Sequence, residues 1–200
     1  MARKTQISKN IILQSALELL IEKGYREINI KTLSQKIGCS TQPIVWHFGS
    51  MNGLRKELAE YALHYANEKM RSNANGTKAF ANIGAAYIEM AFEEPHLFHY
   101  LYMSGDTGYV AENFDVFTSD ENAVMAEQIA VQLKIPIDEV NTYGTNMMIY
   151  THGLASFIVS GLVKASREEV WQMMNRLSEE LLSQARTNSK NITVKDGKEG

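Results

Sequence analysis

Three absences narrow the classes of protein to which this sequence can belong. Cys39 is the only cysteine, so no disulfide can form within the chain. No apolar run approaches the roughly 20 residues that span a bilayer. The N-terminal residues MARKTQISKN lack the apolar core of a signal peptide. We therefore expect a cytoplasmic protein that has no association with a membrane.

The motifs of common catalytic sites are missing as well. The sequence has no glycine-rich phosphate loop, no HExxH zinc motif and no GxSxG nucleophile elbow. His96 and His99 stand beside Glu93 at a spacing that a metal site can use, but no third histidine or cysteine accompanies them locally. We expect neither enzyme activity nor a cofactor nor a metal. An enzyme stays open as an alternative that a turnover screen would test.

Charge is distributed unevenly along the chain, whose net charge is −3. Residues 1–58 contain nine Lys and Arg against four Asp and Glu, a net charge of +5, whereas residues 59–200 have a net charge of −8. A positive segment suits a polyanion such as nucleic acid. The asymmetry predicts two functional parts, and a chance excess of a few charges is the alternative.

Apolar residues recur at helical spacing through most of the sequence, and no strand pattern of useful length appears. The chain is 44% hydrophobic, which is enough for a packed core. Ser8, Ser40 and Ser166 are the expected N-caps, and Gly24 is expected to end the first helix. The segment YVAENFDVF, which starts at Tyr109, is ambiguous. Helices are predicted at 8–23, 31–37, 41–47, 52–73, 78–92, 95–104, 119–133, 138–163 and 167–186.

These elements predict an all-α fold in three parts. Residues 1–51 form a three-helix head, residues 52–187 form a larger helical bundle, and residues 188–200 form a polar tail that we expect to fray. Helix 138–163 is apolar on most sides, which is typical of a helix packed between others. Together with the apolar row of helix 167–186, it predicts a homodimer joined by a four-helix bundle.

The stretch GCSTQPIVWHF, which begins at Gly38, combines a turn with a short helix of mixed polarity. Two short helices joined by a glycine-containing turn form a helix-turn-helix, whose second helix enters the major groove of DNA. Ile44 and Phe48 stand four residues apart, so both are expected to face the core of the head. The remaining, partly polar side chains are then available to the DNA.

The expected DNA contacts lie on and around this second helix. Gln42 can pair with an adenine edge, and Val45 can contact a thymine methyl group. Lys31 opens the first helix of the pair, where N–H groups also attract a phosphate. Packing within the head is the alternative for Trp46 and His47. The expected DNA-binding residues are Lys31, Thr32, Ser40, Thr41, Gln42, Val45, Trp46, His47 and Lys56.

At these residues the sequence resembles the TetR family of bacterial transcriptional regulators. The resemblance covers Ile12 to Leu58 and includes ALELLIEKGYREINIKTLSQKIGCS and the WHF at 46–48. It implies that residues 1–51 are a helix-turn-helix DNA-binding domain and that residues 52–187 are a ligand-binding and dimerisation domain. It also implies a homodimer that represses a promoter and releases double-stranded operator DNA when a small molecule enters the helical body. The chain departs from the family at Val45 and Met51, where Tyr and Lys are frequent, and so lacks two phosphate partners. A helical interaction protein that does not bind DNA is the alternative.

The body is rich in methionine and aromatic residues. Some of them are expected to line a cavity for a hydrophobic or amphipathic effector, because methionine adapts to irregular shapes. The alternative for each is that it only fills the core. His152 and the thiol of Cys39 are expected to pack in the core, and a ligand contact and a redox sensor are their respective alternatives. The expected effector-binding residues are Tyr87, Met90, Tyr102, Met147, Tyr150 and Thr151.

Overall fold

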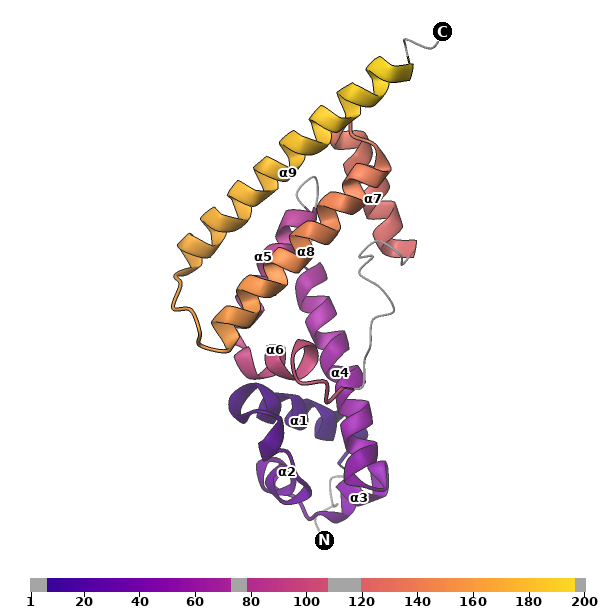
Figure 1. Cartoon of the computed structure of the whole chain (residues 1–200). Coiled ribbons are helices and arrows are strands. Elements are labelled where there is room, and N and C mark those ends of the chain that lie inside the picture. Colours follow the sequence, from indigo (N-terminus) through magenta and orange to yellow (C-terminus); the bar gives the residue numbers. More distant parts are fainter. Residues whose placement is uncertain (1–6, 73–78, 108–119, 197–200) are drawn as a thin grey trace. The chain divides into compact units, whose positions relative to one another are not determined.

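The computed structural model describes residues 7–72, 79–107 and 120–196, and within these ranges all regular structure is helical (Figure 1). The prediction of an all-α fold is therefore confirmed. The elements are α1 (Lys9–Lys23), the 3-10 turn η1 (Tyr25–Glu27), α2 (Ile30–Ile37), α3 (Gln42–Phe48), α4 (Met51–Arg71), α5 (Ala79–Glu93), α6 (Pro95–Tyr102), α7 (Asp120–Leu133), α8 (Ile137–Val159) and α9 (Arg167–Asp196).

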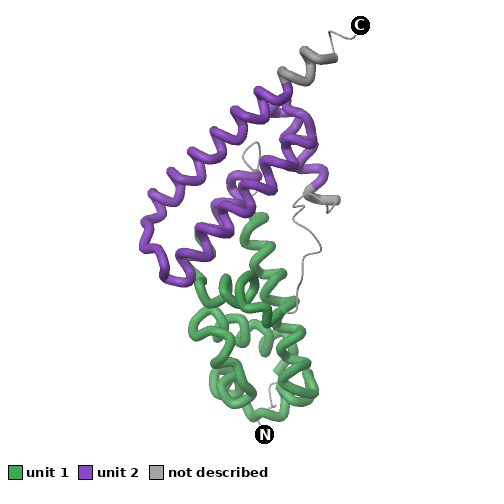
Figure 2. Tube along the Cα trace, viewed as in Figure 1, with its two compact units in different colours: residues 1–72, 89–109 green, residues 73–88, 110–200 purple. Residues whose placement is uncertain are grey.

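The chain divides into two compact units (Figure 2). Unit 1 comprises residues 1–72 and 89–109, and unit 2 comprises residues 73–88 and 110–200. Unit 1 keeps α4 together with the three helices before it, because α1 and α3 both pack against α4. This division by packing is distinct from the functional division expected after residue 51, which stays a prediction.

Unit 1 is built around α1, against which α2, α3, α4 and α6 all pack. The apolar side chains Ile12, Ala16 and Leu20, which recur at helical spacing along α1, are inaccessible to solvent. Burial of each large apolar side chain stabilises the fold by about 1.5–3 kcal/mol. The other helices of the unit contribute further fully buried side chains, namely Leu33, Ile44, Leu54, Leu58, Leu97 and Phe98.

Polar side chains cap two of the helices as predicted. Ser8 Oγ accepts the N–H of Ile11 at 3.3 Å, and α1 ends at Gly24, whose φ of 86° is readily adopted only by glycine. At the start of α9, the N–H of Glu169 donates to Ser166 Oγ at 3.2 Å, and the N–H of Ser166 donates to Glu169 Oε2 at 2.8 Å. This reciprocal pair is a capping box, which confirms Ser166 as a helix start.

Several sequence-based boundaries differ from the structure, of which three change the interpretation of a helix end. Ser40 is the expected cap of α3, but the residue directly before this helix is Thr41. The backbone of Thr41 is already helical, and its side chain makes no capping hydrogen bond. Helix α8 ends at Val159 instead of residue 163, since Gly161 follows with a φ of 71°. Helix α9 continues to Asp196 rather than ending at residue 186. The ambiguous segment 109–117 lies outside the described residues.

Unit 2 is organised by α8, which packs against both α7 and α9. Tyr143 of α8 donates or accepts a hydrogen bond at 2.8 Å with the hydroxyl of Ser178 on α9, and its ring lies 5.6 Å from the ring of Phe80. The buried centre of this packing includes Ala126, Ile135, Val140 and Ala185. Part of the apolar surface of α8 and α9 is thus buried by contacts within one chain.

Candidate nucleic-acid interface

The turn between α2 and α3 fixes the two helices of the motif. Gly38 adopts a left-handed conformation, with φ 73° and ψ 33°, in which a residue with a side chain is strained. Its N–H donates to the carbonyl of Gln35 at 3.2 Å, and the N–H of Cys39 donates to the carbonyl of Ser34 at 3.0 Å. These bonds satisfy the last carbonyls of α2 and end the helix where the sequence predicts.

Helix α3 has the two faces that its sequence predicts. Ile44 and Phe48 are buried, whereas Trp46 is 70% exposed and Val45 is 45% exposed. Gln42, at the start of the helix, is exposed as well. The helix is therefore anchored by two apolar side chains and presents the intervening residues to solvent.

Helix α4 begins directly after α3 through a close backbone approach at Gly53. A Cβ atom added there would clash with the carbonyl oxygen of Phe48. Ser50 caps α4 by accepting the N–H of Gly53 at 3.2 Å. The sequence analysis did not identify Gly53, although a glycine within a helical pattern is a signal for such an approach.

The two lysines among the predicted DNA contacts carry charges that no ion pair with a described residue neutralises. Lys31 and Lys56 are exposed, and neither forms an ion pair with a described residue. Lys36, by contrast, pairs with Glu22 at 3.1 Å and with Glu18 at 3.3 Å. Unpaired lysines at the surface are the groups that neutralise phosphates and displace their counterions.

The side chain and the N–H of Thr32 form hydrogen bonds at the N-terminus of α2. Its hydroxyl accepts the N–H of Asn29 at 3.1 Å and donates to the carbonyl of Glu27 at 2.7 Å, while its N–H donates to Asn29 Oδ1 at 3.0 Å. The pair is a capping box that the sequence analysis missed. This N–H is therefore already satisfied, so a phosphate contact by Thr32 would depend on the remaining acceptor capacity of its hydroxyl.

The imidazole of His47 links α3 to the start of the chain. Its Nε2 atom lies 2.9 Å from the carbonyl oxygen of Ile7, at hydrogen-bond distance, and its ring meets the ring of Trp46 edge-on at 4.5 Å. This contact gives His47 the structural role within the head that the sequence left open as the alternative to a DNA contact. Only Nδ1 is left for a contact with DNA, which stays a prediction.

The predicted effector-binding residues fall into both units. Tyr87 of α5 forms a hydrogen bond at 2.8 Å with Nδ1 of His152 on α8, and Ser156 Oγ lies 3.4 Å from Nε2 of the same ring. Burial lowers the pKa of His152. Unit 2 holds Tyr87, Met147, Tyr150 and Thr151, and unit 1 holds Met90 and Tyr102. Met90, Met147 and Thr151 are buried, and burial raises the pKa of Tyr102 to about 12.

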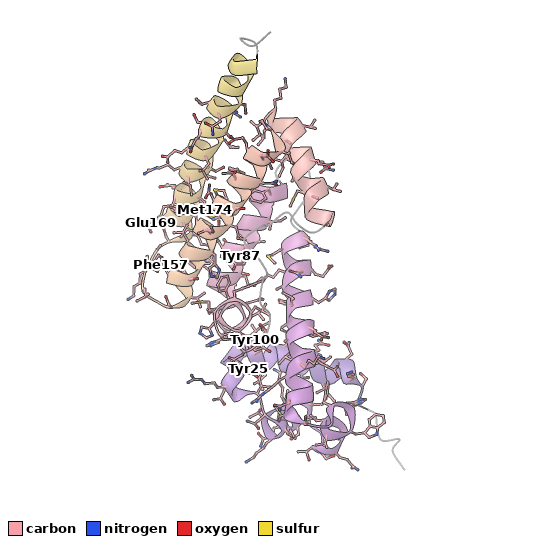
Figure 3. The ribbon with its side chains drawn as sticks, turned by 45° about the vertical axis from the view of Figure 1, so that its right-hand side comes forward. Tyr25, Tyr87, Tyr100, Phe157, Glu169 and Met174 are labelled. Atoms are coloured by element: carbon pink, nitrogen blue, oxygen red, sulfur yellow. The ribbon has the colours of Figure 1, made fainter. Side chains whose placement is uncertain are left out.

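The head also contacts α6, which the sequence analysis did not anticipate. Tyr25 stacks on Tyr100 of α6, as the two labelled side chains in Figure 3 show, with ring centroids 4.7 Å apart. The guanidinium of Arg55 lies 5.5 Å from the centroid of the Tyr25 ring. His96 lies so close to Gly24 that a Cβ atom there would be 3.3 Å from its Nδ1. Contacts of this kind join residues far apart in sequence and leave no local signal.

No group of three His, Cys, Asp or Glu side chains in the described part of the chain is placed to hold a metal ion. Cys39 is a free thiol of intermediate exposure in the turn before α3. No helix in the ranges that the structure describes has both the length and the apolar character needed to cross a membrane.

A scan against known protein families matches residues 12–58 to the bacterial regulatory proteins of the tetR family. These are the bounds over which the sequence resembles that family, and they cover α1 from Ile12 onward, α2, α3 and the start of α4. A comparison with curated proteins found no match. The chain thus carries the N-terminal helix-turn-helix domain of the tetR family, and it is a DNA-binding transcriptional regulator rather than an enzyme.

Proposed function

We propose that this regulator is a repressor that places α3 in the major groove of an operator. The exposed face of α3 is the observation that carries the proposal, because Ile44 and Phe48 hold the helix in the core while Gln42, Val45 and Trp46 face solvent. The first residues of a recognition helix reach base edges. Gln42 suits an adenine, and Val45 suits a thymine methyl group.

Phosphate contacts would set the register of this helix on the duplex. Lys31 and Lys56 support the proposal because both are exposed and carry no ion pair to a described residue. They would replace the phosphate partners that the chain lacks at Val45 and Met51. The indole N–H of Trp46 would add a further donor to the backbone.

A homodimer is the second part of the proposal. Ile149 and Phe157 of α8 are each 50% exposed, and Met173 of α9 is also exposed. Two such helices from each subunit would bury these side chains in a four-helix bundle. The two heads would then meet successive major grooves, roughly 34–36 Å apart.

Release by a hydrophobic or amphipathic effector is the third part. Helix α4 belongs to the matched domain at its start, and its later residues Tyr65 and Lys69 bond to Glu94 beside α6. An effector that displaced α6 or the end of α4 would therefore move the head. If the effector binds the released state about 100-fold more tightly, the coupling free energy is about 2.7 kcal/mol.

Fluorescence anisotropy with DNA from upstream of the protein's own gene tests this function. We expect saturable binding that survives excess scrambled DNA and weakens steeply with salt. Equal affinity for the scrambled DNA would contradict operator recognition. For an identified effector, calorimetric titration into free and operator-bound protein should give different affinities, and equal affinities would contradict the switch.

A further inference from the structure

Glu94 is a buried carboxylate that the proposed DNA contacts do not use. It precedes α6, and the residue is only 9% exposed. A side-chain oxygen at the position before a helix can accept backbone N–H groups of the helix that follows, as the oxygens of Ser, Thr, Asp and Asn commonly do. Glu94 makes no such capping bond, and Pro95, the next residue, has no N–H to donate.

One oxygen of this carboxylate is fully engaged by α4. Glu94 Oε1 accepts the hydroxyl of Tyr65 at 2.8 Å and the ammonium of Lys69 at 2.9 Å. Tyr65 and Lys69 are four residues apart, so they lie on the same face of α4. The carboxylate is thereby held in one orientation.

The other oxygen, Glu94 Oε2, is buried and accepts no hydrogen bond from any residue that the structure describes. An ionised carboxylate can accept about four hydrogen bonds through its two oxygens. A buried charged acceptor without a donor is unfavourable, because burial removes its hydrogen bonds to water and no protein donor replaces them. A proton on Oε2 would only replace an acceptor without a donor by a donor without an acceptor.

The charges around Glu94 indicate which donor would complete the site. Lys69 is shared with Glu93, whose Oε2 lies 3.3 Å from its Nζ. Two carboxylates and one ammonium leave the group with a net negative charge. A cation is attracted to this group, whereas a carboxylate or phosphate ligand is repelled.

We infer that Glu94 Oε2 accepts an N–H group of a cationic amphipathic effector, of which a primary alkylammonium is the simplest example. This inference rests on the proposed function, because it names the chemical class of the effector. An ammonium offers three donors and no acceptor, which matches an oxygen that lacks a donor. Because Glu94 also holds Tyr65 and Lys69, the bound cation acts directly on α4, the helix that continues from the head.

Three probes with eight carbons test the inference in calorimetric titrations of the full chain, namely octylammonium, 1-octanol and octanoate. The two ions are used below their micelle concentrations and the alcohol below its solubility limit. We expect octylammonium to bind about ten-fold more tightly than 1-octanol, as is typical of a hydrogen bond to a charged group. Octanoate should bind more weakly than either. Equal binding of octylammonium and 1-octanol, or no binding of octylammonium, would overturn the inference without any variant.

Glu94→Gln keeps the shape of the side chain and removes its charge, so it should abolish the preference for octylammonium. Glu60→Gln is the matched control, because Glu60 is an exposed carboxylate of α4 that makes no contact with Glu94, Glu93 or Lys69 among the described ion pairs. Tyr65→Phe removes only a donor to Oε1 and should also keep the preference. A preference that persists in Glu94→Gln, or that Glu60→Gln loses equally, contradicts the site.

Operator binding, measured separately by anisotropy, distinguishes the two proposals. A variant that binds operator normally and has lost the preference for octylammonium supports the site and shows that the head is folded. If wild-type protein binds octylammonium with this preference but remains bound to operator DNA, the cation site is supported and the proposed switch is wrong. If it binds neither octylammonium nor any operator, both proposals fail.

Discussion

Tyr25 and Tyr100 stack with their ring centroids 4.7 Å apart and their planes inclined by 29°. Tyr25 follows Gly24, the residue that ends α1 of the DNA-binding head, and Tyr100 lies in α6 and is 1% exposed. Stacked aromatic pairs contribute about 0.5–1.5 kcal/mol beyond the burial of their surface. Within unit 1, α6 is thus fixed to the end of the first helix of the head. A displacement of α6 would reach the head through this stack as well as through α4.

Two tyrosine hydroxyls should differ sharply in their contribution to stability. The Tyr100 hydroxyl is buried and bonds to no described residue, so Tyr100→Phe removes an unsatisfied polar group and should leave the free energy of unfolding unchanged or raise it by up to about 1 kcal/mol. The Tyr65 hydroxyl donates to the Glu94 carboxylate, so Tyr65→Phe should lower it by about 1.5–3 kcal/mol. Urea unfolding at neutral pH measures both. Equal losses in the two variants would contradict this assignment of hydrogen bonds.

Much of the head could be predicted from the sequence because its signals are local. Ser8 and Gly24 mark the two ends of α1 through their own backbone preferences, and the spacing of Ile44 and Phe48 gives the buried face of α3. The exposure of Trp46 follows from the same spacing. Each of these inferences needs only the residues within one or two helical turns.

The features that sequence reasoning missed depend on partners far along the chain or on exact backbone geometry. Helix α9 continues past residue 186, and Asn188 donates to Glu139 Oε1 of α8 at 3.1 Å, a contact that no local pattern indicates. The Tyr25–Tyr100 stack is of the same kind. Thr32 and Asn29 form a local box, but its residue types fit a DNA contact equally well.

The capping box of α2 predicts that Thr32 contributes to folding. Thr32→Val keeps the shape of the side chain but removes the hydroxyl, so we expect a loss of about 1 kcal/mol in the free energy of unfolding. Thr32→Ser retains the hydroxyl and should be close to wild type. Thermal and urea unfolding of both variants check this, and a Thr32→Val protein as stable as Thr32→Ser would show that the box is unimportant.

His152 should make stability depend on pH. Burial lowers its pKa below the value of about 6.5 that it has in the unfolded chain. Between the two values the unfolded state binds more protons, so this contribution is complete above about pH 6.5 and is lost as the pH falls through the folded pKa. The wild type should therefore lose more stability than His152→Gln between pH 7.5 and pH 5.5, as measured by urea unfolding. Parallel losses would exclude His152 as the source.

The exposed face of α8 predicts how the protein assembles. Wild-type protein should sediment as a dimer at micromolar concentration, and Phe157→Asp should sediment as a monomer because it would bury an unpaired charge in the proposed bundle. Val131→Asp is the matched control, since Val131 of α7 is 80% exposed and lies outside that face. A monomeric wild type, or a dimer that persists in Phe157→Asp, would contradict the proposed interface.

Within the head, phosphate contacts should contribute to affinity for all DNA sequences, whereas base contacts should determine the sequence preference. Lys31 is exposed at the start of α2, so Lys31→Ala should weaken binding to all DNA sequences alike and reduce the salt slope by about one. Its pattern of base preference should stay that of the wild type. A change in base preference in this variant would mean that Lys31 reads a base rather than a phosphate.

The most direct test of the account is the binding of Gln42→Ala to a set of operators in which every base pair is substituted in turn. If α3 reads the major groove through Gln42, the variant should lose about 1–3 kcal/mol on the natural operator. It should also lose its preference at one base pair of each half-site and keep the preferences elsewhere. An affinity and a preference pattern identical to those of the wild type would contradict the placement of Gln42 at a base edge, and with it the central claim that the exposed face of α3 recognises the operator.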